Sequence, residues 1–214
     1  MKPSVSRHRS IAVIAPLAFI GLLASARADD KMPAAAQLGV GQMVPAVSVH
    51  APDGTVVNLS ETVKTKPAVL IFYRGGWCPY CNTHLGALNE IEADLTAAGY
   101  QLLAISPDQP AKLHDAPKRK EKPAYTLLSD QDAAAIDAFG ISFVVPDELV
   151  AKYKSSYKID LEADSGRTHH KLPHPAVYIV DSKGKIRFAH VDPDYKKRLD
   201  PAKILAAAKA AMDS

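Results

Sequence analysis

Cysteine and tryptophan are scarce in this chain, and long apolar runs are absent. Among 214 residues there are 2 cysteines and 1 tryptophan. So few cysteines exclude a disulfide-rich miniature domain and a zinc site built from four thiolates. The formal net charge is only +3, which gives no electrostatic reason to expect nucleic-acid binding. No stretch reaches the about 20 apolar residues that a membrane-spanning helix needs, so we expect a mature protein without a membrane anchor.

The first 28 residues have the features of a secretory signal. Positive charge comes first, from Lys2, Arg7 and Arg9, and an apolar run over residues 11–23 follows. Ala26-Arg27-Ala28 then offers a small-x-small cleavage site. A retained membrane anchor is the competing interpretation, but the apolar run is short for a span. We therefore expect cleavage after Ala28 and a secreted, periplasmic or otherwise extracytoplasmic mature protein.

The rest of the chain predicts one α/β domain over residues 45–214, preceded by a loose lead-in at 29–44. A hairpin is expected around residues 47–57, and buried strands at 68–73 and 102–106 flank a helix at 78–98. A strand at 125–128 and a short helix at 133–139 continue the alternation typical of a parallel sheet covered on both faces. Strands at 176–181 and 186–191 and a helix over 201–212 close the domain. Residues 140–172 form an insertion with one helix expected near 147–157.

The two cysteines, Cys78 and Cys81, form a C-x-x-C pair. A disulfide across so small a loop constrains little of the unfolded chain, so reactivity explains the pair better than stability. A buried strand leads into the pair and a helix leads out, which places Cys78 at a helix amino terminus. There the helix dipole favours a thiolate. Cys81 lies one turn on, within reach of a mixed disulfide, and Pro79 stiffens that turn.

Metal binding is an alternative role for the cysteine pair. A C-x-x-C motif can supply two of the four ligands of a zinc site, and His169, His170 and His174 could complete a zinc or copper(I) site in a metal-binding module. No cofactor is otherwise expected.

Three further side chains are candidates for support of the thiols. We expect Trp77 to be a packing lid beside the pair and His84 to be a solvent-facing histidine that could tune Cys81. Glu92 is either a buried acid that passes protons to the pair or a surface carboxylate.

The segment FYRGGWCPYC (residues 72–81) resembles the active site of the thioredoxin superfamily. The later segment LPHPA (172–176) places His174 and Pro175 directly before a strand. The resemblance implies a thioredoxin-like three-layer α/β/α fold, with a mixed central sheet and an amino-terminal β-hairpin extension. It also implies a cis peptide bond at Pro175, facing the thiols.

More closely, residues 41–211 resemble the peroxiredoxin-like branch of the alkyl-hydroperoxide-reductase and thiol-specific-antioxidant family. The same two segments and RFAHVDPDY (187–195) carry this resemblance. The pattern departs from that of the family, in which proline and threonine precede the cysteine that aligns with Cys81. Here Arg74 and Cys78 occupy those positions, and Pro175 stands where the family has its catalytic arginine. We therefore consider Arg74 a candidate for the cation beside the thiolate.

The resemblance implies an antioxidant enzyme that reduces hydroperoxides through a dithiol–disulfide cycle on Cys78 and Cys81. An external, thioredoxin-like thiol donor would reset the pair. Reduction or oxidation of protein disulfides is the alternative. The family pattern makes Cys81 the attacking thiol and the thioredoxin pattern makes it Cys78; the helix-end argument favours Cys78 as the more exposed thiolate.

Overall fold

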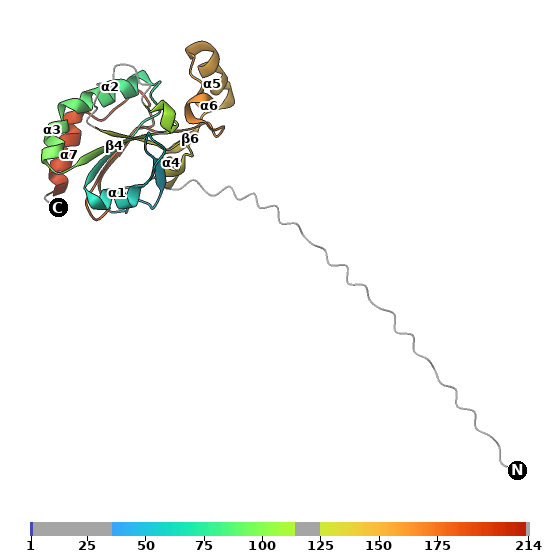
Figure 1. Cartoon of the computed structure of the whole chain (residues 1–214), viewed down its shortest axis with the longest axis horizontal. Coiled ribbons are helices and arrows are strands. Elements are labelled where there is room, and N and C mark those ends of the chain that lie inside the picture. Colours follow the sequence, from blue (N-terminus) through green and yellow to red (C-terminus); the bar gives the residue numbers. More distant parts are fainter. Residues whose placement is uncertain (2–35, 114–124, 213–214) are drawn as a thin grey trace. The chain divides into compact units, whose positions relative to one another are not determined.

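The computed structural model describes residues 1, 36–113 and 125–212. Apart from Met1, the expected signal at 1–28 lies outside this part. The core is a seven-stranded sheet in the order β2-β1-β5-β4-β3-β8-β9 (Figure 1). Its strands are β1 (Ser48–His50), β2 (Val56–Asn58), β3 (Ala68–Phe72), β4 (Gln101–Ser106), β5 (Thr126–Ser129), β8 (Ala176–Val180) and β9 (Ile186–Val191).

The sheet is mixed, as the thioredoxin-like fold class requires. Strand β4 lies between β3 and β5 and is parallel to both. Strand β8 is antiparallel to β3 and to β9, and the β1–β2 hairpin joins the other edge through β5. These pairings confirm the expected fold, including the hairpin at the amino-terminal end of the domain.

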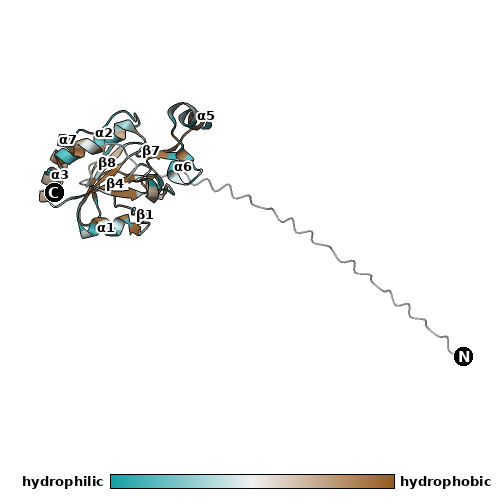
Figure 2. Ribbon diagram, turned by 45° about the horizontal axis from the view of Figure 1, so that its top comes forward, coloured by the Kyte–Doolittle hydropathy of each residue, from teal (hydrophilic) through white to brown (hydrophobic). Residues whose placement is uncertain are grey.

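Helices cover both faces of the sheet, which makes the domain three-layered (Figure 1). The helices are α1 (Leu59–Thr65), α2 (Pro79–Ala87), α3 (Glu92–Ala97), α4 (Ala134–Ala138) and α7 (Pro201–Met212). Along β3, Val69 and Ile71 pack towards α2, α3 and α7, whereas Leu70 and Phe72 pack towards α1 and α4. A strand buried on both faces needs an unbroken apolar run, and the central strands are correspondingly brown in Figure 2.

The helix expected over residues 78–98 is interrupted. Helix α2 ends at Ala87, a 3₁₀ turn spans Leu88–Glu90, and α3 follows. The side chain of Asn89 donates a hydrogen bond of 2.8 Å to the carbonyl of Gly86, and this local bond competes with the regular helical pattern. Helix α1 was not predicted, although Asn58 caps it by accepting a hydrogen bond from the backbone N–H of Glu61.

The lead-in is not loose where the structure describes it. The backbone N–H of Gly41 donates to the carbonyl of Ile186, and that of Val44 donates to Gly184, each at 2.8 Å. The side chain of Val44 belongs to the buried core. No helix in the described ranges is long and apolar enough to cross a bilayer.

The insertion forms a small unit with its own apolar core. Strands β6 (Ser142–Val144) and β7 (Lys171–Pro173) pair antiparallel and enclose two helices. These are α5 (Asp147–Lys152), which continues as a π-helical turn over Tyr153–Tyr157, and α6 (Leu161–Ser165). The single helix expected near 147–157 is thus present, with a change of helix type inside it.

Candidate active site

The two cysteines lie where the strand–helix pattern predicted. Strand β3 ends at Phe72, the chain turns through residues 73–77, and Cys78 is the N-cap residue of α2. Pro79 occupies the first helical position and Cys81 follows within the first turn. Both thiols are free, but neither is exposed: the accessible fractions are 1% for Cys78 and 0% for Cys81. Cys78 was expected to be the more exposed thiolate, but the structure buries it almost as fully as Cys81.

The environment gives the two thiols opposite acidities. The pKa of Cys78 is lowered from 9.0 to about 6, chiefly by a hydrogen bond from the Cys81 thiol. The backbone N–H of Cys81 and the positive charges of Arg74 and Arg198 act in the same direction, while burial opposes them. The pKa of Cys81 is raised by its burial and by its role as hydrogen-bond donor to Cys78. At neutral pH the pair therefore consists of a Cys78 thiolate and a protonated Cys81.

The loop before α2 has a shape that only glycine permits at position 75. Gly75 has φ +150°, and a Cβ atom there would lie 2.4 Å from Trp77 Nε1 and 2.7 Å from Asp108 Oδ1. The carboxylate of Asp108 also accepts a hydrogen bond of 2.7 Å from the backbone N–H of Gly76. Asp108 is buried after β4 and was missed by the sequence analysis, because nothing near residue 108 in the sequence connects it to the cysteines.

Arg74, the candidate cation, is a buried side chain surrounded by aromatic rings. Its guanidinium carbon lies 5.1 Å from the ring centroid of Trp77, 5.7 Å from that of Tyr153 and 4.5 Å from that of Tyr195. Its Nη2 donates a hydrogen bond of 2.6 Å to the Tyr153 hydroxyl, and its Nε has no hydrogen-bond partner within the described chain. Rings attract a cation without neutralising it, so the charge of Arg74 remains available to Cys78.

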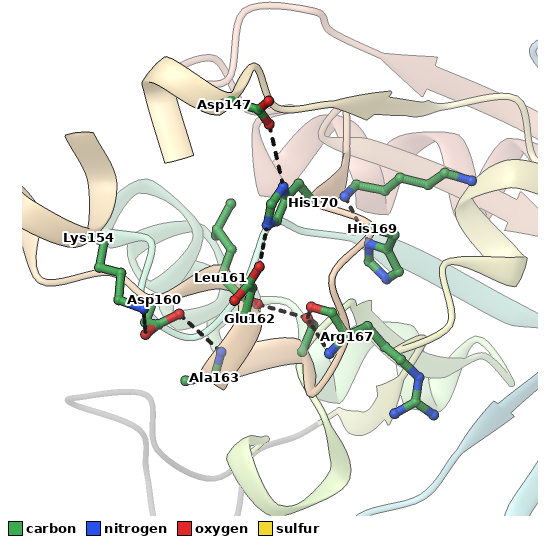
Figure 3. Close-up of polar contacts among 11 residues, drawn as sticks. Asp147, Lys154, Asp160, Leu161, Glu162, Ala163, Arg167, His169 and His170 are labelled. Atoms are coloured by element: carbon green, nitrogen blue, oxygen red, sulfur yellow. Dashed lines mark hydrogen bonds and ion pairs between the residues drawn. The ribbon is translucent and has the colours of Figure 1, made fainter. Parts of the chain in front are cut away.

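The insertion supplies Tyr153 to this cluster and is itself held by polar contacts (Figure 3). His170 lies between α5 and α6, with Nε2 3.0 Å from Glu162 Oε1 and Nδ1 3.9 Å from Asp147 Oδ1. Lys154, next to Tyr153, forms an ion pair of 2.8 Å with Asp160. His170 thus joins α5 to α6, and the Lys154–Asp160 ion pair joins the turn that carries Tyr153 to the start of α6.

Trp77 connects the insertion to the thiol-bearing layer of the domain. Its ring is partly buried against the core that contains both cysteines and against the small core of the insertion. It lies 6.0 Å from the Tyr153 ring. This position agrees with the expected packing lid.

A second arginine, Arg198, contacts Cys81 and was not predicted. It lies between β9 and α7, and its Nη2 donates a hydrogen bond of 3.1 Å to Cys81 Sγ. Its Nη1 donates to the backbone carbonyls of Tyr195 and Lys197, at 2.6 and 2.7 Å. The two partners are 117 residues apart in the sequence, and no motif marks the arginine.

His84 is buried rather than solvent-facing, which corrects the expectation. Its Nε2 lies 3.1 Å from the carbonyl oxygen of Leu199, and burial, assisted by the charge of Arg198, lowers its pKa to about 4. A neutral imidazole that donates to this carbonyl anchors the loop carrying Arg198. The sequence does not reveal this burial because the loop before α7, which contacts His84 through Leu199, lies far from α2 in the sequence.

Pro175 is buried next to the site, and its predicted cis peptide bond is not found: the described chain contains no cis peptide bonds. Pro175, His84 and Arg198 line the same small pocket. The neighbouring His174 stacks on Phe143 at 4.8 Å between ring centroids, and burial lowers its pKa. His174 therefore packs against the insertion.

The remaining candidates do not approach the thiols. Glu92 is half-buried in the first turn of α3, and no polar contact joins it to either cysteine in the described ranges, as expected for a surface carboxylate. His169 contacts the carbonyl of Gln131, and His170 contacts Glu162. The described part of the chain holds no group of three potential metal ligands, so the zinc and copper interpretations find no support there.

Comparisons with known proteins identify the family of this chain. The model of the AhpC/TSA family matches residues 40–189. Peroxiredoxin Bcp of Escherichia coli is 29% identical over 163 residues, which cover 74% of this chain and 88% of that protein. Chloroplastic peroxiredoxin Q of Suaeda salsa is 29% identical over 155 residues, covering 72% of this chain and 61% of that protein. A Haemophilus influenzae relative is 34% identical, and the match spans 66% of its length.

Solved structures share the fold at lower identity. Peroxidoxin BcpB of Mycobacterium tuberculosis superposes with a TM-score of 0.62 at 18% identity, covering 81% of this chain and 98% of that chain. Reduced Prx3 of Vibrio vulnificus in complex with hydrogen peroxide superposes with a TM-score of 0.64 at 17% identity, covering 80% and 99%. Since the family model spans more than half of the sequence, the chain belongs to the AhpC/TSA family and is a peroxiredoxin-like member of the thioredoxin superfamily.

Proposed function

We propose that this protein is a thiol peroxidase in which Cys78 attacks the hydroperoxide and Cys81 resolves the product. The Cys78 thiolate attacks one peroxide oxygen and breaks the O–O bond, so that Cys78 becomes a sulfenic acid. The other oxygen leaves as alkoxide or hydroxide and takes a proton from solvent, which gives an alcohol or water. Cys81 then attacks the Cys78 sulfur, so that a disulfide forms and water leaves. An external dithiol donor of the thioredoxin type returns both cysteines to thiols by exchange.

The observation that carries this assignment is the unequal acidity of the pair. Cys78 is the N-cap of α2, accepts the thiol hydrogen bond of Cys81, and has a pKa lowered to about 6. Cys81 is its protonated donor. Because the thiolate is the nucleophile, Cys78 is the group ready to react at neutral pH.

Burial of both sulfur atoms favours a small substrate. Cys78 has 1% of its surface accessible, and a hydroperoxide needs far less space than the extended backbone of a protein disulfide substrate. The relatives named peroxiredoxins and the peroxide-bound Prx3 structure support the same substrate class. Protein disulfide exchange is therefore the less favoured activity.

The test is mass spectrometry of Cys78→Ser and Cys81→Ser after one equivalent of hydrogen peroxide, with a sulfenic-acid trap. We expect Cys81→Ser to carry the trap on Cys78 and Cys78→Ser to remain unmodified. The reverse labelling would refute the assignment, and a wild type that consumes no peroxide with a thiol donor would refute the activity.

We also propose that the protein acts outside the cytoplasm after export. The charged start, the apolar run over 11–23 and the Ala26-Arg27-Ala28 site support a cleaved signal. Amino-terminal sequencing of the protein recovered from a secretion-competent host should begin at Asp29. An uncleaved cytoplasmic product would contradict export.

A further inference from the structure

Arg198 has a direct contact with a reacting atom that the proposed first step does not use. Its Nη2 lies 3.1 Å from Cys81 Sγ, whereas the sulfur that attacks the peroxide belongs to Cys78. Cys81 has no accessible surface, so water cannot stabilise a negative charge on it. A thiolate at Cys81 therefore depends on charges and donors supplied by the protein.

The guanidinium of Arg198 is held in place by groups that do not cancel its charge. Nη1 donates to the carbonyls of Tyr195 and Lys197, and the next residue, Leu199, is fastened to α2 through His84. Among the residues described, no carboxylate forms an ion pair with Arg198. A planar guanidinium can donate to two carbonyls through one terminal nitrogen and to a sulfur atom through the other. The ammonium group of a lysine could not make these contacts in the same geometry.

Resting on the proposed function, we propose that Arg198 is a catalytic residue of the second step, where it stabilises the Cys81 thiolate that attacks the Cys78 sulfenic acid. The S–S bond forms as the S–O bond of the sulfenic acid breaks. The hydroxyl group leaves with the proton released by Cys81, so that one water is produced and no further reactant is needed. Arg198 keeps its charge throughout.

The timing of the two steps follows from the charges around Cys81. In the reduced protein the Cys78 thiolate repels a second negative charge, and Cys81 stays protonated. Once Cys78 is a neutral sulfenic acid, that repulsion is gone while the Arg198 contact remains. Arg198 favours the Cys81 anion in both states, and the opposing charge of Cys78 is removed when the peroxide has reacted.

Neighbouring groups cannot take this role. His84 lies one helical turn beyond Cys81 but is neutral, and its Nε2 is engaged by the Leu199 carbonyl. The side chain of Arg74 is held in the aromatic cluster and interacts with Cys78. Its backbone N–H also favours the Cys81 anion, but that contribution is present whichever side chain occupies position 198.

Single-turnover kinetics of the full chain test the proposal. Reduced protein is mixed with excess hydrogen peroxide, and the fluorescence of Trp77 is followed, with quenched samples assigned by mass spectrometry. The first step gives a rate proportional to peroxide concentration and the second a rate independent of it. We expect Arg198→Met to slow the second step by about tenfold, the effect of one unit in the pKa of Cys81, while the first changes by less than about threefold. Sulfenic acid should then accumulate.

Lys197→Met is the matched control, since it removes a positive charge from the same loop without touching a thiol, and both of its steps should keep the wild-type rate. Arg198→Lys keeps the positive charge and should therefore recover part of the second-step rate. A second step as slow as that of Arg198→Met would refute an electrostatic role. The second-step rate should also rise with pH as Cys81 ionises. The midpoint of this rise should lie at a lower pH in wild type than in Arg198→Met. The charged and titratable groups around Cys81 are Cys78, Arg74, His84 and Arg198, and of these the arginines keep their charge and His84 stays neutral at neutral pH.

An unchanged second step in Arg198→Met would overturn the proposal, and so would an equal slowing of both steps, which indicates a structural role. If the wild-type protein shows no step whose rate depends on peroxide concentration, the proposed function itself is overturned, and so is the role of Arg198 that rests on it.

Discussion

The loop before α2 and the loop before α7 each bring an arginine to the thiol pair, but they hold it by different means. Arg74 is buried among three aromatic rings and donates to the Tyr153 hydroxyl. Arg198 is fixed by backbone carbonyls of its own loop. The packing of Arg74 depends on Tyr153 of the insertion and on Tyr195 of the loop before α7, whereas Arg198 is held by carbonyls of its own loop, which His84 anchors. The two supports meet at Tyr195, whose ring packs on Arg74 and whose carbonyl accepts a hydrogen bond from Arg198.

The strongest disruption of the first loop should come from Gly75→Ala. The added Cβ would meet Trp77 Nε1 and Asp108 Oδ1 at less than 3 Å, at a φ of +150° that alanine rarely adopts. We expect a loss of about 3 kcal/mol in the free energy of unfolding, measured by urea denaturation. Gly86→Ala in α2, where a Cβ meets nothing within 4 Å, should instead be neutral or stabilising by up to about 1 kcal/mol. Equal effects at both positions would show that the loop shape is not constrained.

Arg74→Met should show that Arg74 acts mainly on Cys78, whereas Arg198 acts mainly on Cys81. Loss of the buried charge should raise the pKa of Cys78 by about one unit, measured from the ultraviolet absorbance of the thiolate in a Cys81→Ser background. Arg198→Met in the same background should raise it less. A larger effect from Arg198 would reverse the assignment of the arginines.

The ionisation of Cys78 should also appear in the pH dependence of stability. Its pKa is lowered from 9.0 to about 6 on folding, so between these values the unfolded chain holds a proton that the folded protein has released. The stability of the reduced protein should therefore rise with pH across this window, by no more than about 1.4 kcal/mol per unit, and the contribution is lost as pH falls towards 6. Urea titrations of wild type and Cys78→Ser should differ by this slope; parallel curves would mean that Cys78 is not ionised.

The smallest expected effect is that of Tyr153→Phe, which removes one hydrogen bond to Arg74 and keeps the ring. We expect a loss of about 1 kcal/mol in stability, because the guanidinium nitrogen loses its partner in a buried site. The rate of disulfide formation, which we assign to Arg198, should not change. Tyr157→Phe, at an exposed hydroxyl of the same turn, is the control. A slower second step in Tyr153→Phe would show that the Tyr153 hydroxyl also acts on Cys81.

Much of the fold was predictable because its signals are local. The apolar run of β3 and the helix over residues 201–212 appear in the structure as expected. Asp200 precedes this helix and accepts a hydrogen bond of 2.8 Å from the backbone N–H of Ala202. The site was predictable only in part. The burial of His84 and the role of Asp108 depend on segments that are distant in the sequence and pack against them. The residues next to His84 and Asp108 in the sequence do not identify those segments.

Sequence alone determined that two thiols meet at the start of one helix, since residues 68–81 encode a buried strand, a glycine turn and a proline at the first helical position. Only the tertiary structure decided how the thiols differ. Packing excludes water from both sulfur atoms, and it brings Arg198 to Cys81 across 117 residues of chain. Acidity in a dry site depends on which charges lie nearby in space, and that is a property of the folded arrangement.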